Sequence, residues 1–176
     1  MPYQLVRTMR NRLRSPAHPS RPVRCRPSLE ALEERWLLAT HTWLGIGTPN
    51  WSDPESWSPT APTVGESTVV LIFQAGVSQR ATIDDLDGLS VDQIVFGDGY
   101  SIAGQTPGTH LAFTGADTAI VAAAAGCSFG PDLVLVLDGT AIFQLANVTT
   151  ATGGPTVQVD STITGPGGLT LTGAAR

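Results

Sequence analysis

The sequence of 176 residues has no lysine and few charged residues of any kind. Charged residues make up 14% of the chain, against about 25% in an average soluble protein. The two cysteines are Cys25 and Cys127, which excludes a framework of several disulfides. No apolar run reaches about 18 residues, so we expect no transmembrane helix. Hydrophobic residues still make up 41% of the chain, which is enough to build a core.

The charges are divided unequally between two segments. Residues 1–35 contain eight Arg and three Glu, for a net charge of +5, whereas residues 36–176 contain two Arg and twelve acidic residues, for −10. In the first 28 residues or so, arginines alternate with prolines, which predicts an unfolded leader. A nucleic-acid-binding arm is an alternative, but no aromatic residues lie between the arginines and the remainder is acidic. A targeting leader fits the pattern better, and we expect no nucleic-acid partner.

Residues 28–39 have the spacing of a short amphipathic helix. Leu29, Leu32, Trp36 and Ala39 fall on one face, and Ser28 is a suitable N-cap. The block resembles the Leu-Glu-x-Leu-Glu-x-Arg-x-Leu-Leu leader motif of large bacterial extracellular proteins. That resemblance implies export or sorting to the cell surface. A solvated helix that packs on the following domain remains the alternative.

From residue 69 onward the sequence predicts strands and turns, and therefore an all-β fold. Gly-rich and Pro-rich breaks separate the candidates, and no window after residue 40 has helical periodicity with caps. Three Asp-Gly pairs, at 87–88, 98–99 and 138–139, are possible hairpin turns of a sandwich. The strand candidates are residues 69–73, 81–83, 89–96, 100–103, 111–113, 119–122, 133–137, 141–145, 157–163 and 169–171.

A solenoid is the alternative to a sandwich or barrel. Residues 100–104, 111–115 and 169–173 share the pattern apolar–x–apolar–x–Gly, which supports a weak repeat. With about 20–25 residues per coil, residues 69–173 would form four or five coils. On these patterns alone, the choice between the architectures stays open.

A resemblance to a known family favours the solenoid. Residues 161–174 resemble the autotransporter-associated β-strand repeat, although Leu171 stands where that family often has Lys. Residues 42–73 resemble the segment that often precedes such repeats. The resemblance implies a right-handed parallel β-helix on an exported bacterial protein. We therefore divide the chain into a leader (1–40), a Trp-rich cap (41–68) and solenoid repeats (69–176), and we expect the array of repeats to be truncated.

Two short segments invite a catalytic or metal-binding interpretation. Residues 126–130 match the G-x-S-x-G nucleophile elbow, but no His follows His110, so we interpret them as a Gly-rich turn between strands. Asp84, Asp85 and Asp87 could form an irregular calcium site, although EF-hand spacing is absent and a solvated acidic turn is the alternative. The histidines and cysteines lack metal-ligand spacing. We therefore expect no cofactor and no metal.

The strongest candidates for ligand binding are three tryptophans, Trp43, Trp51 and Trp57. Their rings could stack on sugars, with Asn50 and Asp53 as hydrogen-bonding neighbours. The favoured alternative is that the rings cover the first coil, since the terminal repeats of a solenoid need caps.

These observations favour a non-catalytic structural or adhesion-type β-solenoid, secreted or displayed on a bacterial surface. A carbohydrate-binding module is the alternative function. A β-helical lyase is disfavoured because the domain has only Arg80 and Arg176 after residue 36 to stabilise a carbanion. The expected partners are extracellular polysaccharide or neighbouring repeats.

Overall fold

The computed structural model describes residues 38–115, 117–122, 126–145 and 156–173. The leader lies outside the described residues up to residue 37, as does almost all of the helix expected at 28–39. Ala39, the last residue of that expected helix, is instead the first residue of a strand. The described residues contain no α-helix, which confirms the all-β prediction for this part of the chain.

Short strands follow one another from residue 39 to residue 172, with one 3₁₀ turn near the start. The elements are β1 (Ala39–Trp43), η1 (Pro54–Ser56), β2 (Trp57–Ser58), β3 (Val69–Phe73), β4 (Ala81–Asp84), β5 (Leu89–Val91), β6 (Gln93–Phe96), β7 (Ser101–Gly104), β8 (Thr109–Phe113), β9 (Asp117–Ala122), β10 (Cys127–Phe129), β11 (Leu133–Leu137), β12 (Thr140–Leu145), β13 (Val157–Val159), β14 (Thr162–Thr164) and β15 (Leu169–Thr172).

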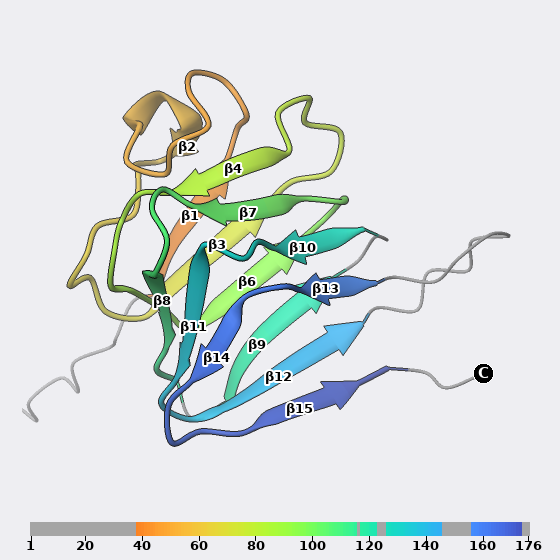
Figure 1. Cartoon of the computed structure of the whole chain (residues 1–176). Coiled ribbons are helices and arrows are strands. Elements are labelled where there is room, and N and C mark those ends of the chain that lie inside the picture. The colour runs from red at the N-terminus through yellow and green to blue at the C-terminus, as the bar shows by residue number, and fades with distance from the viewer. Residues whose placement is uncertain (1–37, 116, 123–125, 146–155, 174–176) are drawn as a thin grey trace, which may run out of the picture. The chain divides into compact units, whose positions relative to one another are not determined.

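The strands form three sheets in which, from β3 onward, every third strand is a neighbour (Figure 1). Sheet A has the order β15-β12-β9-β6-β3-β1-β2, sheet B the order β13-β10-β7-β4, and sheet C the order β14-β11-β8-β5. All pairs are parallel except β1 with β2. The chain therefore winds through sheets A, B and C about four times, as a β-solenoid, within the predicted range of four to five coils.

The register of sheet A gives the length of each coil. Leu71, Ile94, Ile120, Phe143 and Leu171 are successive Cα partners, separated by 23, 26, 23 and 28 residues. Two of these intervals lie within the expected 20–25 residues, and two exceed them. Because the coils differ in length, no fixed period is visible in the sequence.

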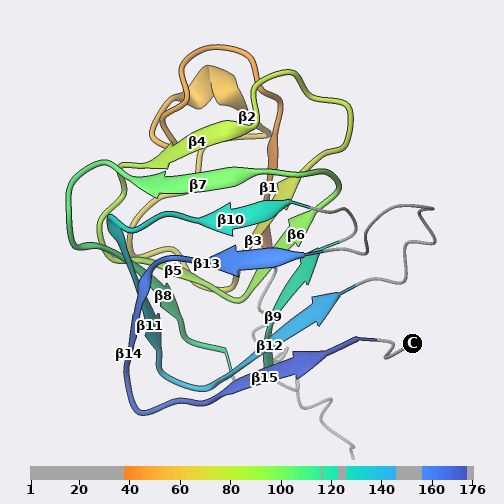
Figure 2. The ribbon, with the colours of Figure 1, turned by 45° about the vertical axis from the view of Figure 1, so that its right-hand side comes forward.

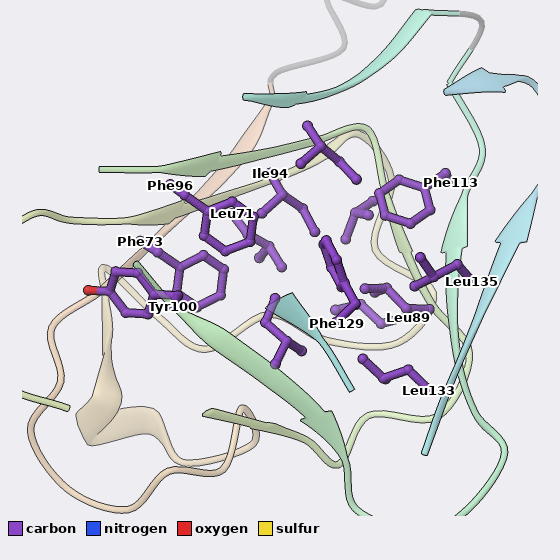
Figure 3. Packing of buried hydrophobic residues seen from close by; sticks show 14 of the residues in the cluster. Leu71, Phe73, Leu89, Ile94, Phe96, Tyr100, Phe113, Phe129, Leu133 and Leu135 are labelled. Atoms are coloured by element: carbon purple, nitrogen blue, oxygen red, sulfur yellow. The ribbon is translucent and has the colours of Figure 1, made fainter. Parts of the chain in front are cut away.

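The core lies between the three sheets, and in strands such as β8, β10 and β11 alternation places every second residue inside it. In β11, Leu133, Leu135 and Leu137 are buried whereas the two valines between them are partly exposed. Aromatic rings continue the core from coil to coil (Figure 3). Phe73 stacks on Phe96 with ring centroids 5.3 Å apart. Further along, Phe96 contacts Phe129, and Phe129 contacts Phe143.

Several sequence predictions need correction. The expected strands 89–96 and 157–163 are each two strands, because a corner at Asp92 and another at residues 160–161 turn the chain onto the next sheet. The Gly-rich turn expected at residues 126–130 contains strand β10, whose Cys127 and Phe129 point into the core. Strands β1 and β2 lie before the region in which strands were expected.

The solenoid repeat is present, but the three short segments that suggested it are not equivalent, and the Asp-Gly pairs do not form the hairpin turns of the alternative sandwich. The three apolar–x–apolar–x–Gly segments fall on β7, β8 and β15, which belong to three different sheets, so they are not equivalent positions of one repeat. The three Asp-Gly pairs occupy corners between sheets, since the strands that flank each pair do not pair with one another.

Candidate functional sites: the tryptophan cap and the acidic corner

The three predicted tryptophans form one buried cluster, which we call the tryptophan cap. Trp43 lies on β1, Trp57 on β2, and Trp51 on the loop between them. Trp43 and Trp51 are fully buried and Trp57 is 3% exposed. The ring of Trp57 meets those of Trp43 and Trp51 edge-on, with centroids 5.0 and 6.1 Å apart, and all three rings contact Phe73. The cluster therefore continues the aromatic core at the first coil.

Hydrogen bonds hold two of the indoles in place. Trp43 Nε1 donates to the carbonyl of Gln79 at 3.0 Å, and Trp57 Nε1 donates to the carbonyl of Trp51 at 2.8 Å. Trp51 Nε1 is buried and has no hydrogen-bond partner among the described residues. In this arrangement no ring face of the three indoles is open to a sugar, so stacking on them would require the cap to open.

The two polar neighbours that the sequence singled out shape the loop that carries Trp51. Asn50 forms a parallel bridge with Ile83 of β4, which adds the loop to the edge of sheet B. Asp53 is the N-cap of η1 and accepts hydrogen bonds from the amides of Thr48 and Glu55. Those bonds, the Thr48 amide first, lower the pKa of Asp53. Both residues have a structural role in these contacts.

A buried histidine at the cap, His41, was not predicted from the sequence. His41, on β1, is 3% exposed, and its Nδ1 donates to the carbonyl of Thr60 at 2.8 Å. Its Nε2 lies 3.1 Å from Oε2 of Glu66 but has no hydrogen-bond partner among the described residues. Glu66 Oε2 also accepts from the amide of Thr63 at 3.2 Å. His41 thus fastens the segment between β2 and β3, but no sequence motif marks it.

The candidate calcium ligands lie at the corner between β4 and β5, which we call the acidic corner, and they diverge. Asp84 points into the core and is fully buried. Asp85 accepts hydrogen bonds from the amide and hydroxyl of Ser52. Asp87 accepts from the amide of His110 at 2.8 Å and lies 3.0 Å from its Nδ1. No group of three or more acidic, His or Cys side chains in the described part of the chain could hold a metal ion.

Asp84 is the most perturbed carboxyl of this corner. Its Oδ1 accepts from the amide of Leu86 at 3.0 Å, and its Oδ2 has no partner among the described residues. Burial raises the pKa of Asp84 to about 7, and the charges of Asp85 and Asp87 add to the increase. The carboxyl group is closed off from solvent.

Burial also suppresses the chemistry of the other reactive groups in the core. It raises the pKa of Tyr100 to about 12, and the Tyr100 hydroxyl donates to the carbonyl of Gln74 at 2.6 Å. It also raises the pKa of Cys127, which is 1% exposed. A thiol is nucleophilic as the thiolate, so Cys127 in this position is a small core residue.

An open groove of about 460 Å³ lies on the outside of sheet B, beside the tryptophan cap. The only charged side chain that lines it is Arg80, whose Nη2 lies 2.5 Å from Asp98 and whose Nε donates to the carbonyl of Val77. The residues that line it, none aromatic, are Pro49, Ser78, Gln79, Arg80, Ala81, Thr82, Ile83, Ser101 and Ala103.

Comparison with known protein families, with curated proteins and with solved structures gives no match to this chain. The assignment of a β-solenoid therefore rests on the strand pairing in this structure alone. The resemblance to autotransporter-associated repeats stays a prediction. Among the described residues, no helix is long and apolar enough to span a membrane.

Proposed function

We propose that this chain is a non-catalytic structural segment of an exported bacterial protein, secreted or held at the cell surface. One observation carries the proposal: the polar groups that the sequence singled out are engaged in holding successive coils together. Asp85 binds Ser52 of the cap loop, and Asp87 binds His110 of the next coil. Such contacts link neighbouring segments of the solenoid and give these carboxylates a structural role.

The sequence supports the export part of the proposal. The leader motif at residues 28–39 resembles that of bacterial extracellular proteins, and residues 161–174 resemble autotransporter-associated repeats. Thr162–Thr164 and Leu169–Thr172 are strands of the described solenoid, and this β-structure of the repeat-like segment supports the proposal. The few charges and many Thr and Gly residues suit a stacked solenoid whose outer surface carries hydroxyl groups.

The export proposal is tested with the full chain, carrying an epitope tag after Arg176, in a bacterium that secretes proteins with this leader motif. Protease added to intact cells should remove the tag. Replacing the apolar face of the leader, with Leu29→Asp and Leu32→Asp together, should leave the tag protected inside the cell. Arg21→Gln, which lies in the basic segment but outside the motif, is the control and should behave as the wild type. An intact leader that leaves the chain in the cytoplasm would overturn the proposal.

The structural role is tested by presenting the folded chain to a glycan array. A structural segment should bind none of the glycans above background. Specific binding that Arg80→Ala abolishes, in a variant that unfolds at the same urea concentration as the wild type, would assign the groove beside the cap to a carbohydrate and replace the structural role.

A further inference from the structure

Three Asp-Gly pairs lie at corners of the solenoid, and a pair of this kind can rearrange without an enzyme. The glycine has no side chain to shield its amide nitrogen, so this nitrogen can attack the carboxyl carbon of the preceding aspartate. The reaction requires that the carboxyl group and the amide are free to turn toward one another. The pairs, which differ in this freedom, are Asp87-Gly88, Asp98-Gly99 and Asp138-Gly139.

The first pair is held by His110, which lies on β8 in the next coil. The carboxylate of Asp87 accepts a hydrogen bond of 2.8 Å from the amide of His110, and its Oδ1 lies 3.0 Å from Nδ1 of the same residue. The Gly88 amide donates to the carbonyl of His110, also at 2.8 Å. Both groups that would react are therefore fixed to the neighbouring strand, and they must leave it before they can meet.

The second pair is held by Arg80. Oδ2 of Asp98 lies 2.5 Å from Nη2 of Arg80 and accepts a long hydrogen bond of 3.5 Å from the amide of Gly76. Oδ1 of Asp98 accepts a hydrogen bond of 2.9 Å from the Gly99 amide. In that bond the N–H points at the carboxylate oxygen, whereas attack requires the nitrogen to stand above the carboxyl carbon. The contacts to Oδ2 resist the necessary rotation, because they fix the plane of the carboxylate.

The third pair, Asp138-Gly139, lies at the corner between β11 and β12, and its reacting groups are not held in this way. Asp138 is exposed to solvent. In the part of the chain that the structure describes, its carboxylate has neither a hydrogen-bond nor an ion-pair partner, and the Gly139 amide donates no hydrogen bond. The one backbone bond at this point runs from the Asp138 amide to the carbonyl of Phe113, at 3.0 Å. The carboxyl group and the attacking nitrogen are therefore free to approach one another.

We propose that Asp138-Gly139 is a site of spontaneous conversion of aspartate to isoaspartate. The Gly139 nitrogen bonds to Cγ of the protonated Asp138 carboxyl group, the bond from Cγ to the hydroxyl oxygen breaks, and this hydroxyl leaves as water with the amide hydrogen. Water then adds to one of the two carbonyl carbons of the cyclic imide. Opening at Cγ restores aspartate, whereas opening at the backbone carbonyl carbon gives isoaspartate, whose peptide bond runs through Cγ. The water released in the first step balances the water added in the second.

The conversion lengthens the backbone by one carbon at a corner on which the next coil rests. The Leu137 carbonyl accepts a hydrogen bond of 2.8 Å from the Gly167 amide, and Gly167 approaches the Gly139 carbonyl so closely that a Cβ has no room between them. Figure 2 shows the turn between β14 and β15 beside the turn between β11 and β12. Isoaspartate at position 138 therefore displaces the carbonyls against which Gly167 packs, and it loosens the stacking of these two coils.

The test is to incubate the full chain for several weeks at neutral pH in water enriched in heavy oxygen, and then to digest it with chymotrypsin. Each passage through the imide places one heavy oxygen in a carboxyl group, and electron-transfer fragmentation distinguishes isoaspartate from aspartate. In the folded chain, Asp138 should take up heavy oxygen about tenfold faster than Asp87 or Asp98, because hydrogen bonds must first break at those two positions. The Gly167 amide should exchange faster in molecules that carry isoaspartate.

Asp87 is the matched control, because Leu86-Asp87-Gly88 and Leu137-Asp138-Gly139 have the same three residue types in the same order. In concentrated urea the two aspartates should react at similar rates, since only the folded chain holds Asp87. Asp138→Glu should form no isoaspartate-type linkage at this corner, because its imide would need a six-membered ring that closes far more slowly. The proposal is overturned if Asp87 or Asp98 reacts as fast as Asp138 in the folded chain. It is also overturned if Asp138 reacts only in urea, or if the difference between Asp138 and Asp87 persists in urea.

Discussion

The indole Nε1 of Trp57 donates a hydrogen bond of 2.8 Å to the backbone carbonyl of Trp51, inside the tryptophan cap. This bond joins β2 to the loop that covers the edge of sheet B. The two rings also meet edge-on, so one pair of residues combines aromatic packing with a buried polar contact. The three rings of the cap therefore pack as a single unit, with Trp57 in contact with both Trp43 and Trp51.

We expect Trp57→Phe to destabilise the fold by about 1–3 kcal/mol, because it leaves the buried Trp51 carbonyl without its donor. Trp57→Ala should cost about 3–5 kcal/mol, since it also creates a cavity. Urea denaturation measures both changes. Ile46→Ala, on the same loop but exposed, should stay within about 0.5 kcal/mol of the wild type. Equal stability of Trp57→Phe and the wild type would contradict a structural role for this bond.

We expect the buried carboxyl of Asp84 to make the fold less stable as the pH rises from about 4 to about 7. Its pKa is about 7 in the folded chain, against an ordinary value of 3.8 for an exposed Asp, so in this interval the folded state holds a proton that the unfolded state has released. Three pKa units correspond to a loss on the order of 4 kcal/mol. The loss is complete above pH 7 and absent below pH 4.

Asp84→Asn should remove this slope and stabilise the protein at pH 8, since an amide oxygen can still accept from the Leu86 amide. The free energy of unfolding, measured in urea at several pH values, tests the prediction. Asp138→Asn, at an exposed corner, should keep the wild-type slope. Asp53 and Asp87 do not interfere, because their lowered pKa values affect stability only below this interval. A flat profile for the wild type would show that Asp84 is not desolvated.

The sequence predicted the strands well wherever buried and exposed residues alternate without interruption. Residues 69–73 and 133–137 were predicted with the observed bounds. The corners were harder to predict, because a chain that passes from one sheet to the next needs only one or two residues to turn. At Asp92 the amide donates to the carbonyl of Val69, and the apolar pattern continues across the corner as if it were one strand.

The roles of the candidate site residues could be predicted only in part. That the tryptophans cover the first coil followed from the need of a solenoid for caps, and their burial agrees with it. The sequence could not predict that the three aspartates point to different partners, because each partner comes from a distant part of the chain. Asp85 and Ser52 are 33 residues apart in the chain, and Asp87 and His110 are 23 residues apart.

We expect the contact between His41 and Glu66 to hold the segment from residue 59 to residue 68. Glu66→Gln removes the carboxylate charge beside Nε2 and should speed amide exchange in this segment by up to about tenfold, with a global cost below about 1 kcal/mol because Glu66 is partly exposed. Hydrogen exchange read by mass spectrometry measures it. Glu55→Gln, at an exposed position, is the control. Unchanged exchange in residues 59–68 would contradict the prediction.

We expect two adjacent glycines of the repeat-like segment to respond in opposite ways to alanine. A Cβ on Gly167 would lie 2.0 Å from the carbonyl oxygen of Gly139 and 2.6 Å from that of Leu137, whereas a Cβ on Gly168 would meet nothing within 4 Å. Gly167→Ala must therefore push β15 away from β12, which breaks the bond from the Gly167 amide to Leu137 and costs about 1–3 kcal/mol. Gly168→Ala should change stability by less than about 0.5 kcal/mol.

Amide exchange in β12 and β15 separates the two glycine variants. In Gly167→Ala the amide of Ala141, which donates to the carbonyl of Gly168, should exchange faster, because the two coils no longer stack at their normal spacing. Gly168→Ala should leave that amide protected. If both variants were equally stable, the last coil would not rest on Gly139 as described. In that case the close approach of the two backbones would not be the reason for a glycine at position 167.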